Sequence, residues 1–431
     1  MRRPIWLPAP FLLCLALGLV AWGGAAQAAT YNWTGSVSSD WGDPRNWSPQ
    51  GVPVAGDSAT VSTGLASLGQ AASISALTLT GGAVSVADLA VTNSFNWQGG
   101  EVRGTLAVPA GATATLTGSA DKVLRGASLT LAGSTSWEGE GNLTGGDGAT
   151  LTNTGLFEVR GDSQLLHAFG NRPSFANRGT LRKLGSSGQT VFPNSSFFFS
   201  NTGTVDVQSG SIVLAGSDHE LKDGTLITGD GKLRIAGARV TGTGTVTVAP
   251  SGQSGTLELA SGVLTGSSTL AGTGFLWTGG DLQGALTIAS GAQGVLDGDQ
   301  PKTLRGAQVT NLGTLVWKGT GGLSGGDAAL LDNQGVFIAT NDAALTHNFG
   351  VRPTFTNSGT LRKQDSPGAT TFPNSSFWLN QRGVLDLQSG TLSLAGGNHT
   401  LAQGSSVVGS GKLLLSGAYV SLEGAVTVSG H

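Results

Sequence analysis

The stretch SFANRGTLRKLGSSGQTVFPNSSFFFSNTGTVDVQSGSIVL, from Ser174 to Leu214, contains one short phrase twice. The phrase reads apolar-x-Asn-x-Gly, where x is any residue. Asn177 recurs as Asn201, 24 residues later, and an earlier copy of the phrase places Asn153 the same distance before Asn177. Self-similarity at a fixed short period is typical of a solenoid.

The repeating units are too short and too rich in Thr, Val, Leu and Gly to be pairs of helices. Runs such as Thr204–Val207 and Ile212–Leu214 alternate in the way of short strands with one buried face. Gly, Ser and Asn between them suit corners, because they tolerate positive φ. The sequence therefore predicts an all-β fold, a parallel β-helix (β-solenoid) with coils of about 22–24 residues.

Stacked coils place equivalent residues above one another, so the repeat predicts columns of side chains. We expect two inward apolar columns, one column of amides at a corner and one outward column of alternating charge: Leu151, Phe175 and Phe199; Phe157, Leu181 and Val205; Asn153, Asn177 and Asn201; Glu158, Arg182 and Asp206. In the second half of the chain the charged column reads Ile338, Arg362 and Asp386. An exposed ion pair in such a column contributes about 0.5 kcal/mol.

Lys183 lies in the inward phase between Val159 and Val207, and Lys363 repeats it. A lysine that faces a core is costly unless its ammonium is paired or reaches water. One interpretation is a corner lysine whose head group lies in water. The other is a lysine held in a groove to meet an anionic ligand.

The chain is internally duplicated with a period of 180 residues and without a gap. Trp97 returns as Trp277, and the phrase FPNSSF at 192–197 returns intact at 372–377. We expect residues 71–250 and 251–431 to be two solenoid copies of about eight coils each. An ungapped duplication is expected to keep a whole number of coils, so that the second copy continues the same cylinder.

The first 28 residues have the pattern of a secretory signal peptide: two arginines, an apolar core at 11–22 and the small-residue site Ala26-Gln27-Ala28. We expect a secreted protein, extracellular or at the cell surface, with the periplasm as a stage in transit. Residues 29–70 contain Trp33, Trp41 and Trp47 and are expected to cap the first coil, since an open solenoid edge invites another chain. The alternative is an aromatic patch that stacks on sugars.

The composition argues against several classes of function. The 431 residues include 71 Gly, are 39% hydrophobic and 11% charged, and carry a formal net charge of −3. No basic stripe predicts nucleic-acid binding, and no segment after the signal peptide predicts a membrane span. The sole cysteine, Cys14, lies inside the signal peptide, so no disulfide is expected in the mature chain. The last coil has no apparent cap, which suggests self-association from head to tail.

The chain resembles secreted bacterial β-strand-repeat proteins, similar to the passenger regions of autotransporter-type adhesins. The phrases that carry the resemblance are W-x-G-G at Trp97 and Trp277, F-x-N-x-G-T-L-R-K at Phe175 and Phe355, and G-T-V-x-V-x-S-G at Gly203. The resemblance covers nearly all of the mature chain. It implies a parallel β-helix, export and display at the bacterial surface, and it leaves the activity open, because a fold does not determine function.

Two sets of residues are candidates for function. A cationic groove could act as a lyase on acidic polysaccharides, with a base that removes a proton beside a carboxylate neutralised by cations; its members are His167, Arg172, Lys183, His347, Arg352 and Lys363. The competing interpretation is that the histidines and arginines bond to turn carbonyls. Sugar binding would use exposed tryptophans, namely Trp97, Trp137, Trp277 and Trp317.

Neither a metal site nor a cofactor is expected, because His and carboxylate residues do not cluster. The favoured function is an exported, non-enzymatic structural or adhesive solenoid that binds polysaccharide or other cell-surface components. The alternative is a polysaccharide lyase or hydrolase built on a β-helix.

Overall fold

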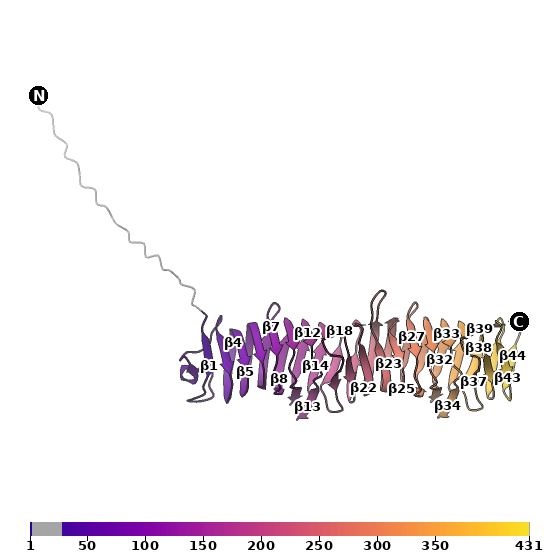
Figure 1. Cartoon of the computed structure of the whole chain (residues 1–431), viewed down its shortest axis with the longest axis horizontal. Helices are drawn as coiled ribbons and strands as arrows, with labels where there is room; N and C mark the ends of the chain where they lie inside the picture. The colour runs from indigo at the N-terminus through magenta and orange to yellow at the C-terminus, as the bar shows by residue number, and fades with distance from the viewer. Residues whose placement is uncertain (2–27, 431) are drawn as a thin grey trace.

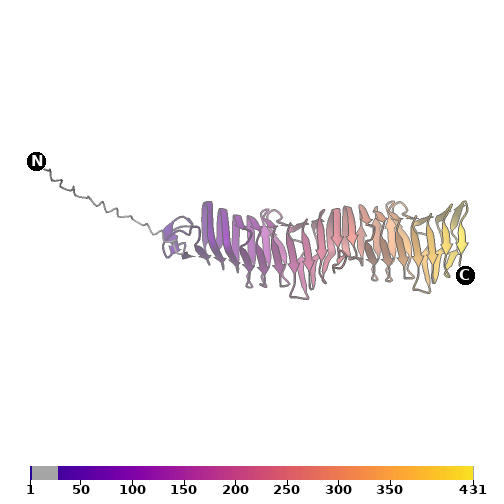
Figure 2. The ribbon, with the colours of Figure 1, turned by 90° about the horizontal axis from the view of Figure 1, so that it is seen from above.

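The computed structural model describes Met1 and residues 28–430. The expected signal peptide therefore lies almost entirely outside the described residues. The described chain is nearly all β and forms a rod of parallel stacked coils, about 17 turns long, with β1 near one end of the rod and β43 and β44 near the other (Figure 1). Seen from above, the strands remain stacked in one row along the whole length (Figure 2). The predicted parallel β-solenoid is confirmed.

Each coil contributes a strand to three ladders, which we number in the order in which the chain meets them. Strands β4, β5, β22 and β23 bend round all three faces, and β6 and β8 cover two. The first ladder contains β1 (Thr30–Trp33), β3 (Ser58–Val61), β4 (Leu65–Leu79), β5 (Ala83–Trp97), β7 (Thr113–Leu116), β9 (Ser134–Trp137), β12 (Leu156–Val159), β15 (Thr180–Lys183), β18 (Thr204–Val207), β21 (Thr225–Thr228), β22 (Lys232–Val248), β23 (Leu257–Gly272), β26 (Ala285–Ile288), β29 (Gln308–Asn311), β32 (Leu330–Asn333), β35 (Thr354–Asn357), β38 (Trp378–Gln381), β41 (Asn398–Ala402) and β44 (Tyr419–Glu423).

The second ladder contains parts of β4, β5, β22 and β23 together with β6 (Gly100–Val108), β8 (Lys122–Leu131), β10 (Leu143–Gly146), β13 (Leu165–Phe169), β16 (Gln189–Phe192), β19 (Ser211–Leu214), β24 (Phe275–Trp277), β27 (Gln293–Leu296), β30 (Thr314–Trp317), β33 (Val336–Ala339), β36 (Thr360–Lys363), β39 (Val384–Leu387), β42 (Ser406–Val408) and β45 (Thr427–Ser429). Between β13 and β16 a single bridge, Gln164 to Val191, continues it.

The third ladder contains parts of β4, β5, β6, β8, β22 and β23 together with β11 (Thr150–Asn153), β14 (Ser174–Asn177), β17 (Phe198–Asn201), β20 (Asp218–Leu221), β25 (Gly280–Leu282), β28 (Lys302–Arg305), β31 (Leu323–Gly326), β34 (Leu345–Phe349), β37 (Ala369–Phe372), β40 (Thr391–Leu394) and β43 (Lys412–Leu415). Here the bridge between Ala344 and Thr371 joins β34 to β37.

The two copies do not keep the same faces. Trp97 is the last residue of β5 and lies in the first ladder. Trp277 lies in β24, which belongs to the second ladder, because β24 pairs with β23, β23 with β22, and β22 with β19. Likewise Asn153 lies in the third ladder and Asn333 in the first. Asn333 belongs to β32, which pairs with β29; β29 pairs with β26, and β26 pairs with the part of β23 that lies in the first ladder. The expectation of a whole number of coils is wrong. The 180-residue unit holds one strand more than a whole number of coils, so each feature of the second copy lies one face further round the rod.

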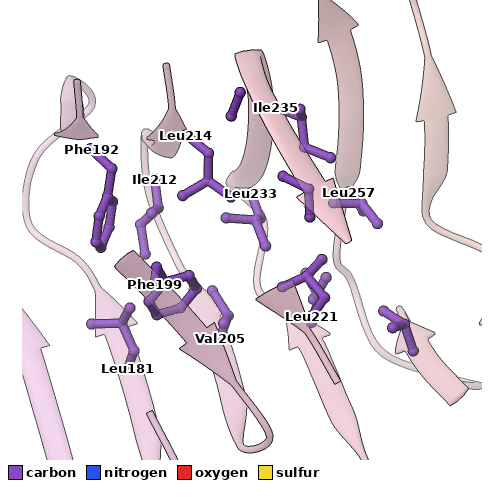
Figure 3. Close-up of a cluster of buried hydrophobic side chains, with 14 of the residues drawn as sticks. Leu181, Phe192, Phe199, Val205, Ile212, Leu214, Leu221, Leu233, Ile235 and Leu257 are labelled. Carbon is purple, nitrogen blue, oxygen red and sulfur yellow. The ribbon is translucent and has the colours of Figure 1, made fainter. Parts of the chain in front are cut away.

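The predicted columns are present. Leu151 pairs with Phe175 and Phe175 with Phe199, and all three side chains are buried. Figure 3 shows part of this interior, where side chains from all three ladders, among them Phe199, Val205 and Leu233, point toward one another. These apolar side chains form one buried cluster that extends along the rod, which removes apolar surface from water.

The Asn-x-Gly phrase has a separate physical reason at each of its two residues. Asn177 is fully buried; its amide nitrogen donates to Asn201 Oδ1 at 2.6 Å, and its Oδ1 accepts from Asn153 at 2.7 Å. A Cβ added at Gly179 would collide with the carbonyl oxygen of Gly155 in the preceding coil. Glycine is required here by the close approach of two main chains.

The outward charged column is also confirmed. Arg182 lies between Glu158 Oε1, at 3.4 Å, and Asp206 Oδ2, at 2.7 Å. In the second copy the pair Arg362–Asp386 persists at 2.7 Å.

The N-terminal tryptophans cover the first coil. Strand β1 pairs with β3 in parallel and with β2 (Trp47–Ser48) antiparallel, and a short 3-10 helix, η1 (Pro44–Asn46), precedes β2. The ring of Trp47 packs edge to face on Trp33 and Trp41, with centroid distances of 5.0 and 4.6 Å, and all three are buried. Buried rings cannot stack on a sugar, so that alternative is wrong. The boundary expected at residue 70 lies inside β4.

Candidate functional site

Lys183 and Lys363 are the buried lysines that the alternation predicted, but their head groups are not in water. Lys183 Nζ donates to Gly161 O at 2.8 Å and lies 3.0 Å from Asp162 Oδ1. Lys363 Nζ makes the matching contacts, to Asn341 O at 2.7 Å and Asp342 Oδ1 at 2.9 Å. The expectation of a hydrated head group is wrong, because a carboxylate from the loop of the preceding coil reaches in to pair with each ammonium.

Asp162 lines a surface hollow of about 450 Å³, together with Glu138, Glu140, Asn142, Gln164 and Ser186. Partial burial would raise the pKa of Asp162, but hydrogen bonds from Ser186 and Lys183 outweigh it and the pKa is lowered. The second copy has a matching hollow of about 340 Å³ around Asp342, where Thr320 replaces Glu140. The two hollows therefore share the lysine–aspartate pair and differ in their remaining charge.

Two further buried lysines were not identified from the sequence. Lys122 Nζ donates to the carbonyls of Gly118 and Ala120 at 3.1 and 2.8 Å, and Lys302 is bonded in the same way. Burial lowers the pKa of both lysines. Their inward position in the phrase K-x-L-R-G was the available signal. Their ammonium groups satisfy corner carbonyls.

His167 and His347 occupy corresponding loops and bond to their own main chain. His167 Nε2 lies 3.2 Å from Phe169 O and 3.0 Å from Gly170 O, so this nitrogen carries the proton. His347 has the same two contacts, to Phe349 and Gly350. This arrangement agrees with the interpretation of histidines that bond turn carbonyls.

His219 and His399 are buried in the core. His219 Nδ1 accepts from the Phe199 amide at 3.1 Å, so Nε2 carries the proton and donates to Gly216 O at 2.9 Å. Burial lowers the pKa of His219 to about 4. His399 has the equivalent bonds, and burial lowers its pKa as well. Both are neutral structural residues near pH 7.

Arg172 connects three successive coils. Its Nε donates to Ser196 O at 2.8 Å, and its Nη2 donates to Phe197 O at 3.2 Å and to Asp218 O at 3.1 Å. The guanidinium lies 5.6 Å from the ring centre of Phe198. Among residues 28–430, Arg172, His167 and Lys183 share no hydrogen bond or ion pair, and the arrangement gives the lyase alternative no support.

The four tryptophans expected to bind sugar are core residues: Trp97, Trp137, Trp277 and Trp317 are all buried. The indole Nε1 of Trp137 donates to Gly141 O at 3.2 Å, and that of Trp317 donates to Gly321 O at the same distance. The expectation that these rings are exposed is wrong, because the alternation places them on the inward side of their strands.

Trp378 is the exposed tryptophan of the described chain, with 40% of its surface accessible. It begins β38 at the position that Phe198 holds in the first copy, and Arg352 lies 5.7 Å from its ring centre. The sequence alone shows that Trp378 replaces Phe198 at the equivalent position, since the flanking phrases are the same in both copies.

Within the described part of the chain, no group of three or more His, Cys, Asp or Glu side chains is arranged to hold a metal ion. No described helix is long and apolar enough to cross a membrane. No family model, curated protein or solved structure matches this sequence.

Proposed function

We propose that this chain is an exported, non-enzymatic β-solenoid rod that acts as a surface scaffold or adhesive element and binds polysaccharide. The observation that supports it best is the continuity of the three ladders, from β4 near one end to β43, β44 and β45 at the other. At about 4.8 Å per coil, about 17 turns make a body roughly 80 Å long. A body of this shape is suited to holding a surface away from its point of attachment.

The polar side chains support a structural role. The buried histidines, lysines and asparagines bond to main-chain carbonyls, to one another or to a surface carboxylate, and so stabilise corners between coils. Export rests on the pattern of residues 1–28, and surface display on the resemblance to adhesin passengers.

The test uses the mature chain from Ala29 with a panel of acidic and neutral polysaccharides: polygalacturonate, alginate, dextran and cellulose. Bound protein and released unsaturated sugar are measured together. Binding without product supports the proposal. Release of unsaturated sugar that is lost in a His167→Ala, His347→Ala double variant would overturn the non-enzymatic part, and absence of binding to every polymer would overturn the polysaccharide part.

Export is tested separately by expressing the full chain in a Gram-negative host and treating intact cells with protease. Accessible protein that begins at Ala29 supports export. Protein that keeps residues 1–28 and stays in the cytoplasm would contradict it.

A further inference from the structure

The duplication provides an internal comparison of one surface feature, an arginine over an aromatic ring. In the first copy Arg172 lies 5.6 Å from the centre of Phe198, and in the second Arg352 lies 5.7 Å from the centre of Trp378. The geometry of the pair is the same in both copies. The surroundings of the pair are not.

The guanidinium is occupied in the first copy and available in the second. Arg172 donates to three main-chain carbonyls of two succeeding coils, and burial lowers its pKa although the nearby carboxylate of Asp218 opposes that shift. Arg352 makes no hydrogen bond to any residue of 28–430, and Asn398 replaces Asp218. The guanidinium of Arg352 is partly exposed, with Nη1 beside Gly397, and keeps N–H donors for an external acceptor.

The aromatic ring of the pair is also more exposed in the second copy than in the first. Phe198 is half-buried, whereas Trp378 is 40% exposed and the other described tryptophans are buried. An exposed indole beside an unsatisfied guanidinium offers a flat apolar face and a fixed cation at one place. This pair of groups suits a ligand with an apolar ring face and a carboxylate, because the ring packs on the indole and the carboxylate accepts from the guanidinium.

We propose that Trp378 and Arg352 form a binding site for a uronic acid unit of an acidic polysaccharide. The pyranose ring packs on the exposed face of Trp378, and the uronate carboxylate accepts hydrogen bonds from Arg352. The inference rests on the proposed function and names the ligand class and the site. The equivalent pair in the first copy has a similar geometry but lacks a free cation and an exposed indole.

In the experiment the mature chain from Ala29 is titrated with polygalacturonate and, separately, with dextran. Calorimetry measures the affinity, and quenching of tryptophan fluorescence by acrylamide measures the accessibility of the indole. Polygalacturonate is expected to bind and to protect the accessible tryptophan from acrylamide, whereas dextran should bind at least about tenfold more weakly. Trp378→Phe, which copies the first repeat, and Arg352→Gln should each weaken polygalacturonate binding about tenfold or more. Arg352→Lys should recover part of the affinity, since it restores the charge without the planar fork.

Phe198→Ala is the matched control in the first copy and should bind polygalacturonate like the parent. Circular dichroism establishes that each variant is folded. If the parent binds polygalacturonate and the Trp378 and Arg352 variants bind it equally well, the site is wrong while the proposed function stands. If the parent binds only neutral polymers, the ligand class is wrong. If it binds no polysaccharide, both proposals fail.

Discussion

The ammonium of Lys183 lies 3.0 Å from the carboxylate of Asp162, although the lysine side chain is fully buried and that of the aspartate is half exposed. The pair recurs as Lys363 and Asp342 at 2.9 Å. A charge inside the solenoid is thus paired with a charge at its surface, one coil earlier in the chain. Such a pair need not add stability relative to apolar residues, but breaking it on one side leaves a buried charge without its partner.

Asp162→Asn should destabilise the rod more than Lys183→Met does. The first change leaves the buried ammonium with a carbonyl and a neutral amide, and we expect a loss of about 2 kcal/mol, reduced from the fully buried case because Asp162 is half exposed. Lys183→Met removes the buried charge and should change the free energy of unfolding by less than about 1 kcal/mol. Urea denaturation followed by circular dichroism at pH 7 measures both. The reverse order of the two variants would contradict this account.

The rod should lose stability as the pH falls from about 6.5 toward 4, because His219 is buried and neutral. Its pKa is about 4 in the folded chain against an ordinary value of 6.5, so the unfolded chain binds more protons in this window. Stability from this group is complete above pH 6.5 and is lost progressively below it, by on the order of 3 kcal/mol. Urea midpoints at pH 7.5 and 4.5 give the difference. His219→Gln should show a smaller pH dependence than the parent, and an equal one would rule out His219 as its source.

Asn177→Ala should cost more than Asn153→Ala, because Asn177 lies in the middle of its amide ladder. The first change leaves Asn201 Oδ1 without its donor and removes one of the two acceptors of the Asn153 amide, whereas Asn153 Oδ1 has no partner to lose within the described chain. We expect about 3 kcal/mol for Asn177→Ala and about 1 to 2 kcal/mol less for Asn153→Ala. Thermal and urea unfolding of the two variants test the order. Equal losses would mean that the ladder does not act through its hydrogen bonds.

The one-face shift between the copies can be tested by cross-linking at their junction. Thr247 pairs with Ala271 in the first ladder, whereas Leu276 lies in the second ladder, one face away from the position of its counterpart Asn96 in the first copy. Residues 29–431 contain no cysteine, so in a chain that begins at Ala29 the pair Thr247→Cys and Ala271→Cys should be joined by a short bismaleimide and detected by mass spectrometry of the digested protein. Thr247→Cys with Leu276→Cys is the control and should remain unlinked. A link in the control pair, with none between Thr247→Cys and Ala271→Cys, would contradict the one-face shift.

The sequence predicted the columns well because the spacing is constant from Asn153 to Asn177 and from Asn177 to Asn201, so the same positions face inward in neighbouring coils. It did not predict the shift, since coil length varies, from 18 residues between Val61 and Leu79 to 27 between Gln164 and Val191. Counting residues therefore does not count strands.

The site was predicted less well than the fold. The inward phase of Lys183 was correct, but its partner Asp162 comes from a loop that carries no periodic signal. The tryptophans of the W-x-G-G phrase were assigned to the surface by their chemistry, although alternation places Trp97 in the core. The difference between Arg172 and Arg352 depends on contacts across two coils, which no local pattern contains.

The extra strand in each 180-residue unit relates the two copies by a screw operation, a rise along the rod combined with one third of a revolution. Loops that are far apart along the sequence but equivalent by duplication follow a spiral track on the exterior, so a straight polymer lying along one side would meet only one member of each pair. A chain that grew by repeating this unit would return to its starting side only after three units. Lengthening by duplication therefore changes the azimuth of every inherited loop, while the hydrogen-bonded interior remains unbroken.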